Sequence, residues 1–437
     1  MYEHITDDLL NFLGKSPTCY HAAANFRTLL RDSGYTELSE GEPWPLAEGG
    51  KYFTVRNGSA LIAFRIPRKD FSGFQIAASH SDSPSFKIKA NPEIGVENAY
   101  VVLNVEKYGG MLCAPWLDRP LSVAGRLIVR RGNRFETRLV NVDRDLLMIP
   151  NLAIHMDRNA NEGHSYNPQK DLLPVFGCGD AKGRFADVIA ESAGVKKEEI
   201  AGSDLFLYSR TPGTVWGAGG EFISSGRLDD LECAYTALRG FLDARENPAS
   251  VPVCAVFDNE EVGSGTKQGA DSTFLSDVLE RIGLACGRTA EQHRTAVASG
   301  FMVSADNAHA VHPSFPEKAD PVNRPHMNGG VVIKYSANQK YTTDAVSAAI
   351  FKAVCETADV PWQEFCNRSD MPGGSTLGNI SNAHVSLNTV DVGLAQLAMH
   401  SPFETAGARD PAYLARAMRV FFGLSLRDAG HGAYTLV

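Results

Sequence analysis

The stretch that decides the fold is Val251-Pro252-Val253-Cys254-Ala255-Val256-Phe257, an apolar run that ends at once in Asp258-Asn259-Glu260-Glu261. Three more apolar runs end in polar residues: FQIAAS (74–79) before His80, GFMVSA (300–305) before Asp306, and VSLNTV (385–390) before Asp391. Short apolar strands separated by helical stretches are typical of a largely parallel sheet flanked by helices. We therefore predict an α/β fold with a mixed, largely parallel sheet. Such sheets bind ligands beyond the carboxyl ends of their strands.

Outward from these strands, the chain divides into two kinds of segment. Residues 5–34 predict two helices separated by Ser16-Pro17-Thr18, where Ser or Thr can cap the second helix. Asn57-Gly58 predicts a hairpin turn between KYFTVR and SALIAFRI. Between about residues 89 and 218 the sequence becomes rich in strand patterns, such as AYVVLNVEKY and LSVAGRLIVRRGNRFETRLVNV. We expect one α/β domain, residues 1–88 and 219–437, interrupted by a β-rich domain, residues 89–218.

Composition narrows the classes of protein that remain. The 437 residues include 42 Lys and Arg against 51 Asp and Glu, which gives a net charge of −9 without any long basic run. Nucleic-acid binding needs clustered basic residues, so we expect no nucleic-acid partner. The N-terminus lacks both the basic start of a signal peptide and an apolar span, so we expect no membrane partner either. Eight scattered cysteines without a CxxC pair indicate reduced thiols and a cytoplasmic location.

Several polar residues at these strand ends are candidates for metal binding. Adjacent buried carboxylates such as Glu260 and Glu261 are costly unless a cation lies between them, although a solvated acidic strand end is an alternative. His80 and Asp82 share one face of an extended segment, so Asp82 can hold one ring nitrogen while the other binds metal. A hydrogen-bonded turn histidine is the alternative there. Asp229 opens a predicted helix and has an N-cap role as its alternative.

Taken together, the candidates form a set of zinc ligands at the ends of separate elements of one sheet. The set comprises His80, Asp229, Glu261, Asp306 and His400. One bridging carboxylate with one carboxylate and one histidine for each ion would give a dinuclear site, and three carboxylates nearly balance two divalent cations. A further loop, Asp370–Thr376, contains Gly374 and Ser375 and precedes a predicted helix. Its free N–H groups and hydroxyls could bind substrate, or it could be an ordinary capped helix start.

These residues resemble the aspartyl aminopeptidases, a family of dinuclear zinc aminopeptidases. The resemblance runs nearly end to end and rests on ordered motifs: Ser16-Pro17, His80-Ser81-Asp82-Ser83-Pro84, Arg227-Leu228-Asp229-Asp230, Asp258-Asn259-Glu260-Glu261-Val262-Gly263-Ser264, Ser304-Ala305-Asp306-Asn307-Ala308-His309-Ala310-Val311-His312-Pro313 and Leu397-Ala398-Met399-His400-Ser401.

The resemblance implies a role for each site residue. His80 and Asp306 would hold one zinc ion and Glu261 and His400 the other, with Asp229 bridging the two ions of each subunit. Cobalt and manganese accept the same ligands. Glu260 would be the general base, Asp82 would orient His80, and the peptide bond between Asp229 and Asp230 would be cis.

The resemblance also implies an assembly and a substrate. The β-rich insertion would mediate dimerisation, and dimers would assemble into a tetrahedral homododecamer. In that assembly His155 would reach a neighbouring subunit's active site, whereas an ordinary surface histidine is the alternative. Peptides with an acidic N-terminal residue would be the substrates, recognised by Lys334 with Tyr341 and His309 nearby. A preference for neutral N-terminal residues, a related amidohydrolase activity and a non-catalytic shell protein remain alternatives.

Overall fold

The computed structural model describes residues 2 and 4–437, and its largest sheet has nine strands. In spatial order these are β1 (Thr36–Leu38), β2 (Gly50–Arg56), β3 (Ala60–Ile66), β13 (Ser250–Phe257), β4 (Gly73–His80), β14 (Phe301–Ala305), β18 (Asn388–Gly393), β16 (Val331–Tyr335) and β17 (Trp362–Cys366). The central strands β13, β4, β14 and β18 are parallel, whereas β3 and β16 pair with them in the antiparallel sense. The predicted mixed α/β class is therefore confirmed.

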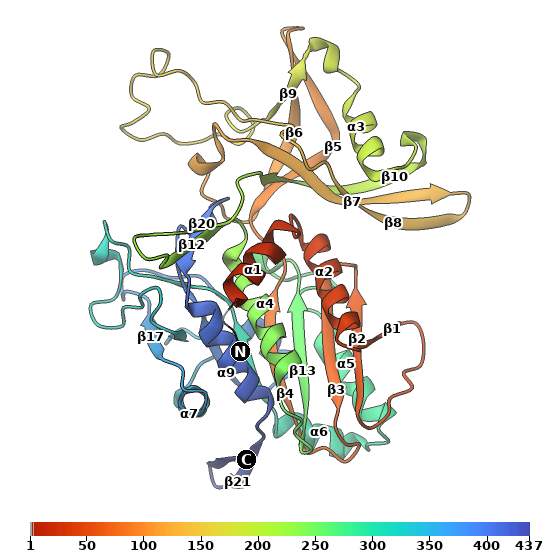
Figure 1. The fold of residues 1–437 in the computed structure, drawn as a ribbon, viewed down its shortest axis with the longest axis vertical. Coiled ribbons are helices and arrows are strands. Elements are labelled where there is room, and N and C mark those ends of the chain that lie inside the picture. Colours follow the sequence, from red (N-terminus) through yellow and green to blue (C-terminus); the bar gives the residue numbers. More distant parts are fainter. Residues whose placement is uncertain (1, 3) are drawn as a thin grey trace.

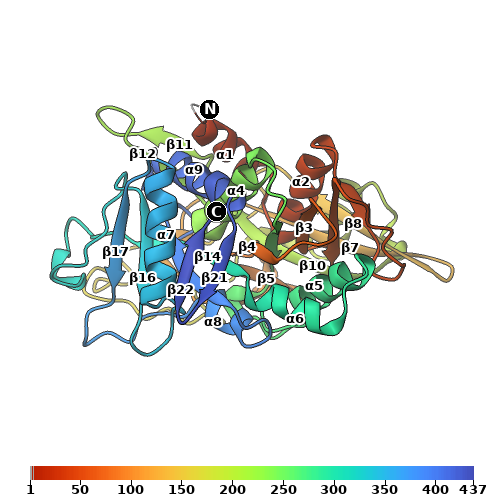
Figure 2. The same cartoon turned by 90° about the horizontal axis from the view of Figure 1, so that it is seen from below.

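Helices cover both faces of this sheet (Figure 2). Five helices share one core with the sheet: α1 (Ile5–Gly14), α2 (Cys19–Asp32), α4 (Leu228–Asp243), α7 (Ala345–Thr357) and α9 (Asp410–Phe422). The opposite core contains α5 (Phe274–Ala285), α6 (Ala290–Ala298) and α8 (Leu377–Asn382). Along β13, Cys254 and Val256 lie in the first core and Val253 and Ala255 in the second. Both faces of the strand are buried, which explains its uninterrupted apolar sequence.

A second sheet lies beyond the carboxyl ends of β4 and β13 (Figure 1). Its six strands, in spatial order, are β8 (Arg134–Asn141), β7 (Leu121–Arg131), β10 (Ile200–Ser209), β5 (Ser85–Val96), β6 (Tyr100–Tyr108) and β9 (Val175–Cys178). With helix α3 (Phe185–Ala193), this sheet buries an apolar core of its own. The second sheet thus occupies the space above the edge where the polar strand ends of the first sheet gather.

A third, five-stranded sheet lies at the same edge. Its order is β11 (Thr214–Trp216), β12 (Phe222–Ser225), β20 (Glu404–Gly407), β19 (Ala395–Leu397) and β15 (Ala308–His309). The chain from β10 therefore passes directly into this sheet at β11. A small hairpin, β21 (Leu426–Gly430) and β22 (Ala433–Leu436), follows α9.

The local predictions have mixed outcomes. The turn at Asn57-Gly58 is confirmed, because both residues have positive φ (57° and 70°) between antiparallel β2 and β3. Capping by Thr18 is wrong: its hydroxyl lies 2.9 Å from His21 Nδ1 and bonds no backbone amide. The prediction that a strand ends at Asp391 is also wrong, because β18 continues to Gly393 and Asp391 is buried within it.

Within the described residues no helix is long and apolar enough to cross a membrane.

Candidate metal centre and active site

The candidate ligands come from five different places at one edge of the large sheet. His80 is the last residue of β4, Asp306 follows β14, and Glu261 lies in a 3₁₀ turn (Glu260–Val262) directly after β13. Asp229 lies in the first turn of α4, and His400 follows β19 of the third sheet. The peptide bond between Asp229 and Asp230 is cis, as the resemblance implied.

The carboxylate of Asp229 lies at the centre of the group. Its Oδ1 is 3.6 Å from His80 Nε2, and its Oδ2 is 3.3 Å from His400 Nε2. Asp306 Oδ1 lies on the His80 side at 3.9 Å from Nε2, and Glu261 Oε2 lies on the His400 side at 3.3 Å. Ligands of a tetrahedral zinc ion are about 3.3 Å apart when each lies about 2.0 Å from the metal. The spacing on both sides of Asp229 is close to that value.

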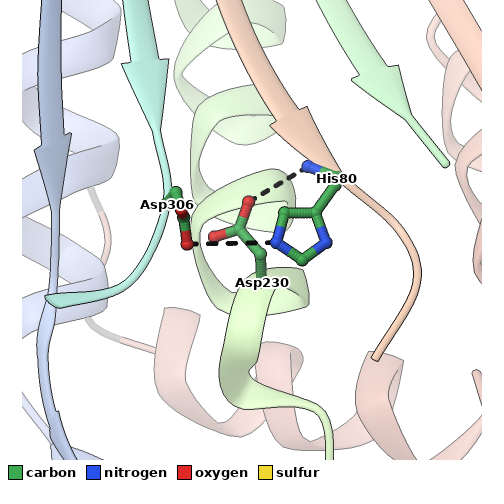
Figure 3. A group of neighbouring side chains, drawn as sticks. All are labelled: His80, Asp230 and Asp306. Atoms are coloured by element: carbon green, nitrogen blue, oxygen red, sulfur yellow. Dashed lines mark hydrogen bonds and ion pairs between the residues drawn. The ribbon is translucent and has the colours of Figure 1, made fainter. Parts of the chain in front are cut away.

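Asp230 is a second acidic group on the His80 side that the sequence did not single out as a ligand. Two sets of side chains have ligand atoms close enough to share an ion: His80, Asp230 and Asp306, and His80, Asp229 and Glu261. Figure 3 shows the first set, in which Asp230 Oδ2 accepts a hydrogen bond of 3.0 Å from the backbone amide of His80. That bond fixes the end of β4 against helix α4.

Several carboxylates are buried together around His80 and Glu260, and they shift the pKa values of both groups. Burial raises the pKa of Glu260 to about 8, and Asp306, Asp82 and Asp229 add to this against the opposing effect of His80. Burial alone would lower the pKa of His80, but Asp229, Asp306 and Asp82 outweigh it and raise that pKa well above its usual value. Glu260 and His80 therefore hold their protons more strongly than isolated groups would, because neighbouring carboxylates are buried with them.

Unpartnered carboxylate oxygens give an independent test of whether metal ions fit. Asp229 Oδ1, Asp230 Oδ1 and Glu261 Oε1 are buried and make no hydrogen bond within the described part of the chain. Buried polar atoms are almost always paired, so three such oxygens on neighbouring residues need a partner. Divalent cations between imidazole nitrogens and carboxylate oxygens meet that need.

Asp82 binds the two strand ends together. Its Oδ1 lies 3.3 Å from His80 Nδ1 and accepts from the backbone amide of Glu260 at 3.1 Å, while Oδ2 accepts from the amide of Glu261 at 3.2 Å. The carbonyl of Asp82 also lies 3.1 Å from His80 Nδ1. Because a carbonyl can only accept, this contact places the proton on Nδ1 and leaves Nε2 facing Asp229.

Beside the ligands lies a cavity of about 150 Å³. It is lined by the ligands, by Glu260, and by Lys334, Tyr341, His309, Gly374 and Ser375, which are the substrate-binding candidates apart from His155. Lys334, at 2% exposure, donates from Nζ to the carbonyls of Asp306 (2.7 Å) and Asn307 (3.2 Å) and lies 5.3 Å from the centre of the Tyr341 ring. The structure thus brings these candidates to one cavity next to the ligands.

His155 is not brought to this cavity. It lies exposed in the long loop between β8 and β9 of the second sheet (Figure 1), and it is absent from the cavity lining. Within one subunit the structure therefore gives His155 no part in the site.

Three residues near the ligands escaped the sequence reasoning. Glu404 is 1% exposed and accepts from the backbone amides of His400 (2.7 Å) and Asp229 (3.0 Å), while burial raises its pKa to about 8. Tyr108, the last residue of β6, contacts Asp82, and Gly110, two residues later, contacts His400. Glu404 is four residues from His400, a spacing that could have drawn attention to it, but nothing in the sequence near Tyr108 signals its contact with a segment 26 residues earlier.

Comparison with known proteins agrees with this geometry. Residues 12–422 match the family model described as Aminopeptidase I zinc metalloprotease (M18). The probable M18 family aminopeptidase 2 of Clostridium acetobutylicum is 47% identical over 424 residues, which cover 95% of this chain and 98% of that protein. The protein of the same description from Streptomyces coelicolor is 41% identical over 95% of this chain and 97% of its own length.

Solved structures show the same fold. The structure of the Ape4 and Nbr1 complex contains a chain with a TM-score of 0.92 and 35% identity, over 96% of this chain and 85% of that one. The mApe1 dodecamer of S. cerevisiae has a TM-score of 0.84 and 28% identity, over 96% and 97% of the two chains. The chain therefore belongs to the M18 family of zinc metallopeptidases, the aspartyl aminopeptidase family, and is a metalloaminopeptidase.

Proposed function

We propose that this aminopeptidase uses two metal ions and releases N-terminal Asp or Glu from peptides. The observation that carries the two-ion proposal is the central position of Asp229, whose two carboxylate oxygens face different histidines at 3.6 and 3.3 Å. His80, Asp229 and Asp306 would hold one ion, and Asp229, Glu261 and His400 the other. Zinc ions bound there would polarise the scissile carbonyl and activate water.

Glu260 is the proposed general base. It lines the cavity beside the ligands, and its backbone amide is fixed by Asp82. Its neighbour Glu261 instead directs Oε2 toward His400. This division leaves the Glu260 carboxylate to accept a proton from water and return it to the leaving amine of the shortened peptide.

The acidic preference rests on Lys334. An ammonium group has three donors, and Lys334 uses two of them on backbone carbonyls. The third can bind the side-chain carboxylate of a substrate residue in the cavity that Lys334 lines. Gly374, Ser375, Tyr341 and His309 complete the proposed pocket around that residue.

We also propose a homododecamer in the cytoplasm. The fold matches that of the mApe1 dodecamer nearly end to end, and the second sheet supplies a separate layer through which dimers could form. The exposed loop at His155 would then reach the cavity of a neighbouring subunit. The eight free cysteines fit a reducing compartment.

A panel of N-terminal aminoacyl substrates, assayed with and without a metal chelator, tests the proposal. We expect chelator-sensitive release of free Asp and Glu, with Ala and Leu substrates slower. Faster release of Leu would refute the acidic preference. Cleavage of acylated amines without aminopeptidase activity would indicate an amidohydrolase, and no hydrolysis at all would indicate a shell protein.

A further inference from the structure

We propose that Tyr108 is a positioning residue for the metal centre. The segment Tyr108–Leu112 would link the second sheet to both ligand histidines by hydrogen bonds and hold their rings in place. The segment begins at Tyr108, the last residue of β6, and lies against residues that come from the first and third sheets. This inference rests on the proposed two-metal site, because its effect is exerted on metal ligands.

Tyr108 holds the His80 side of the site through Asp82. Its hydroxyl donates to Asp82 Oδ2 at 2.7 Å and accepts from Asn259 Nδ2 at 2.8 Å. Both carboxylate oxygens of Asp82 also accept backbone amides, from Glu260 and Glu261. Tyr108 therefore completes the set of donors that fixes the carboxylate beside His80 Nδ1, and it is the member contributed by the second sheet.

The same segment holds the His400 side through its backbone. His400 Nδ1 donates to the carbonyl of Gly110 at 2.5 Å, and the amide of Leu112 donates to the carbonyl of His400 at 3.1 Å. As with His80, a carbonyl acceptor places the proton on Nδ1 and leaves Nε2 available toward Asp229. The two imidazoles thus present the same nitrogen to the same carboxylate.

Gly109 explains how the segment comes so close to the ligands. Its φ is 76°, and a Cβ added there would lie 3.2 Å from both the Cβ and the carbonyl oxygen of Glu261. A larger residue would be strained and would push the segment away from the site. The glycine therefore permits the close approach on which the hydrogen bonds of Tyr108 and Gly110 depend.

The expected consequence concerns metal affinity. Substituting a residue that orients a metal ligand typically weakens metal binding by about 10- to 100-fold. Tyr108→Phe removes one hydroxyl and keeps the ring, which contacts Phe206 edge-on with centroids 5.5 Å apart. We expect it to weaken zinc binding by about 10- to 100-fold and to leave the aromatic contact in place.

The experiment measures zinc affinity by competition with a chromophoric chelator, without any substrate. Tyr52→Phe is the control, because Tyr52 is a buried tyrosine whose hydroxyl accepts from the amide of Ala47 at 3.0 Å, away from the site. We expect Tyr108→Phe alone to lose affinity, and excess zinc to restore its kcat/KM. Unaltered zinc affinity would overturn the inference, whatever the activity.

Thermal unfolding of the metal-free variants separates positioning from a general structural role. We expect the two variants to unfold at similar temperatures. If Tyr108→Phe unfolds far below Tyr52→Phe, or fails to fold, Tyr108 is structural and the inference is wrong. If the unsubstituted protein binds zinc but cleaves no peptide, the proposed function fails while the role of Tyr108 is still decided by the affinities.

Discussion

Replacing Lys334 by Met gives the sharpest test of substrate choice. In the structure the ammonium group is buried at the cavity wall, where it donates to the carbonyls of Asp306 and Asn307 and lies 3.7 Å from Asp306 Oδ2. Methionine has a similar shape but no charge and no donor. The substitution therefore has two effects: it leaves two carbonyls unpaired, and it removes the proposed partner of a substrate carboxylate.

The first effect is the same for every substrate, whereas the second applies only to substrates with an acidic N-terminal residue. Leaving buried carbonyls unpaired costs about 1–3 kcal/mol of stability, and this cost is the same for every substrate. A hydrogen bond between charged groups is worth about 1.5–3 kcal/mol, and Lys334, at 2% exposure, is little screened by water. At about 1.36 kcal/mol per tenfold, kcat/KM for Asp and Glu substrates should fall by roughly 10- to 150-fold relative to Ala or Leu substrates.

The assay compares kcat/KM for Asp, Glu, Ala and Leu substrates at saturating zinc and below the unfolding temperature of the variant. Lys352→Met is the control. Lys352 lies on α7, pairs with Glu364 of β17 at 2.5 Å and does not line the cavity. In this control the ratio of kcat/KM for acidic substrates to kcat/KM for neutral substrates should stay unchanged. If Lys334→Met lowers kcat/KM equally for all four substrates, Lys334 only supports Asp306, and the proposed acidic preference has no basis in this residue.

Three further outcomes are expected. Glu260→Gln should retain both metals and lose about 10²- to 10⁴-fold in turnover, and near-normal turnover with full metal content would remove Glu260 from the mechanism. His155→Ala should impair catalysis without dispersing the oligomer, and mixing it with Glu260→Gln should restore some activity; no recovery after verified subunit exchange would contradict a shared site. Burial raises the pKa of Asp410 to about 7, so the native state holds its proton more strongly than the unfolded chain, and stability from this group is lost as pH rises from about 4 to 7. Asp410→Asn should flatten the fall of Tm over that range, and an unchanged slope would contradict the assignment.

The central part of the fold could be predicted because its strands are buried on both faces. After its first residue, Ser250, β13 has no polar residue until it ends, so its end is visible in the sequence at Asp258. The prediction failed at β18, where Asp391 looked like a strand end. In the structure Asp391 is buried within the strand and accepts from Thr342 and Thr376, two partners from separate loops that no local pattern reveals.

The candidate site divides in the same way. His80, Glu261 and Asp306 follow or end apolar runs, and this pattern predicted that they would lie at one edge of the sheet. The distinction between Glu260 and Glu261 came only from the resemblance. Tyr108 and Gly110 could not be found by either route. Their contacts depend on how the second sheet docks on the first, which is a property of tertiary packing and not of the local sequence.

The division of the site among several elements also determines when its buried carboxylates come together. The large sheet contributes His80, Glu261 and Asp306, the third sheet carries His400 and Glu404, and the second sheet contributes the hydrogen bonds of Tyr108 and Gly110. Asp229 and Asp230 are neighbours on α4, whereas Glu261 and Asp306 follow two different strands, so the full set of carboxylates comes together only when these elements dock. Metal ions that bind the docked state stabilise that state and not its separate parts. We therefore expect metal affinity and the docking of the second sheet to be coupled, because Tyr108 and Gly110 of the second-sheet segment contact Asp82 and His400.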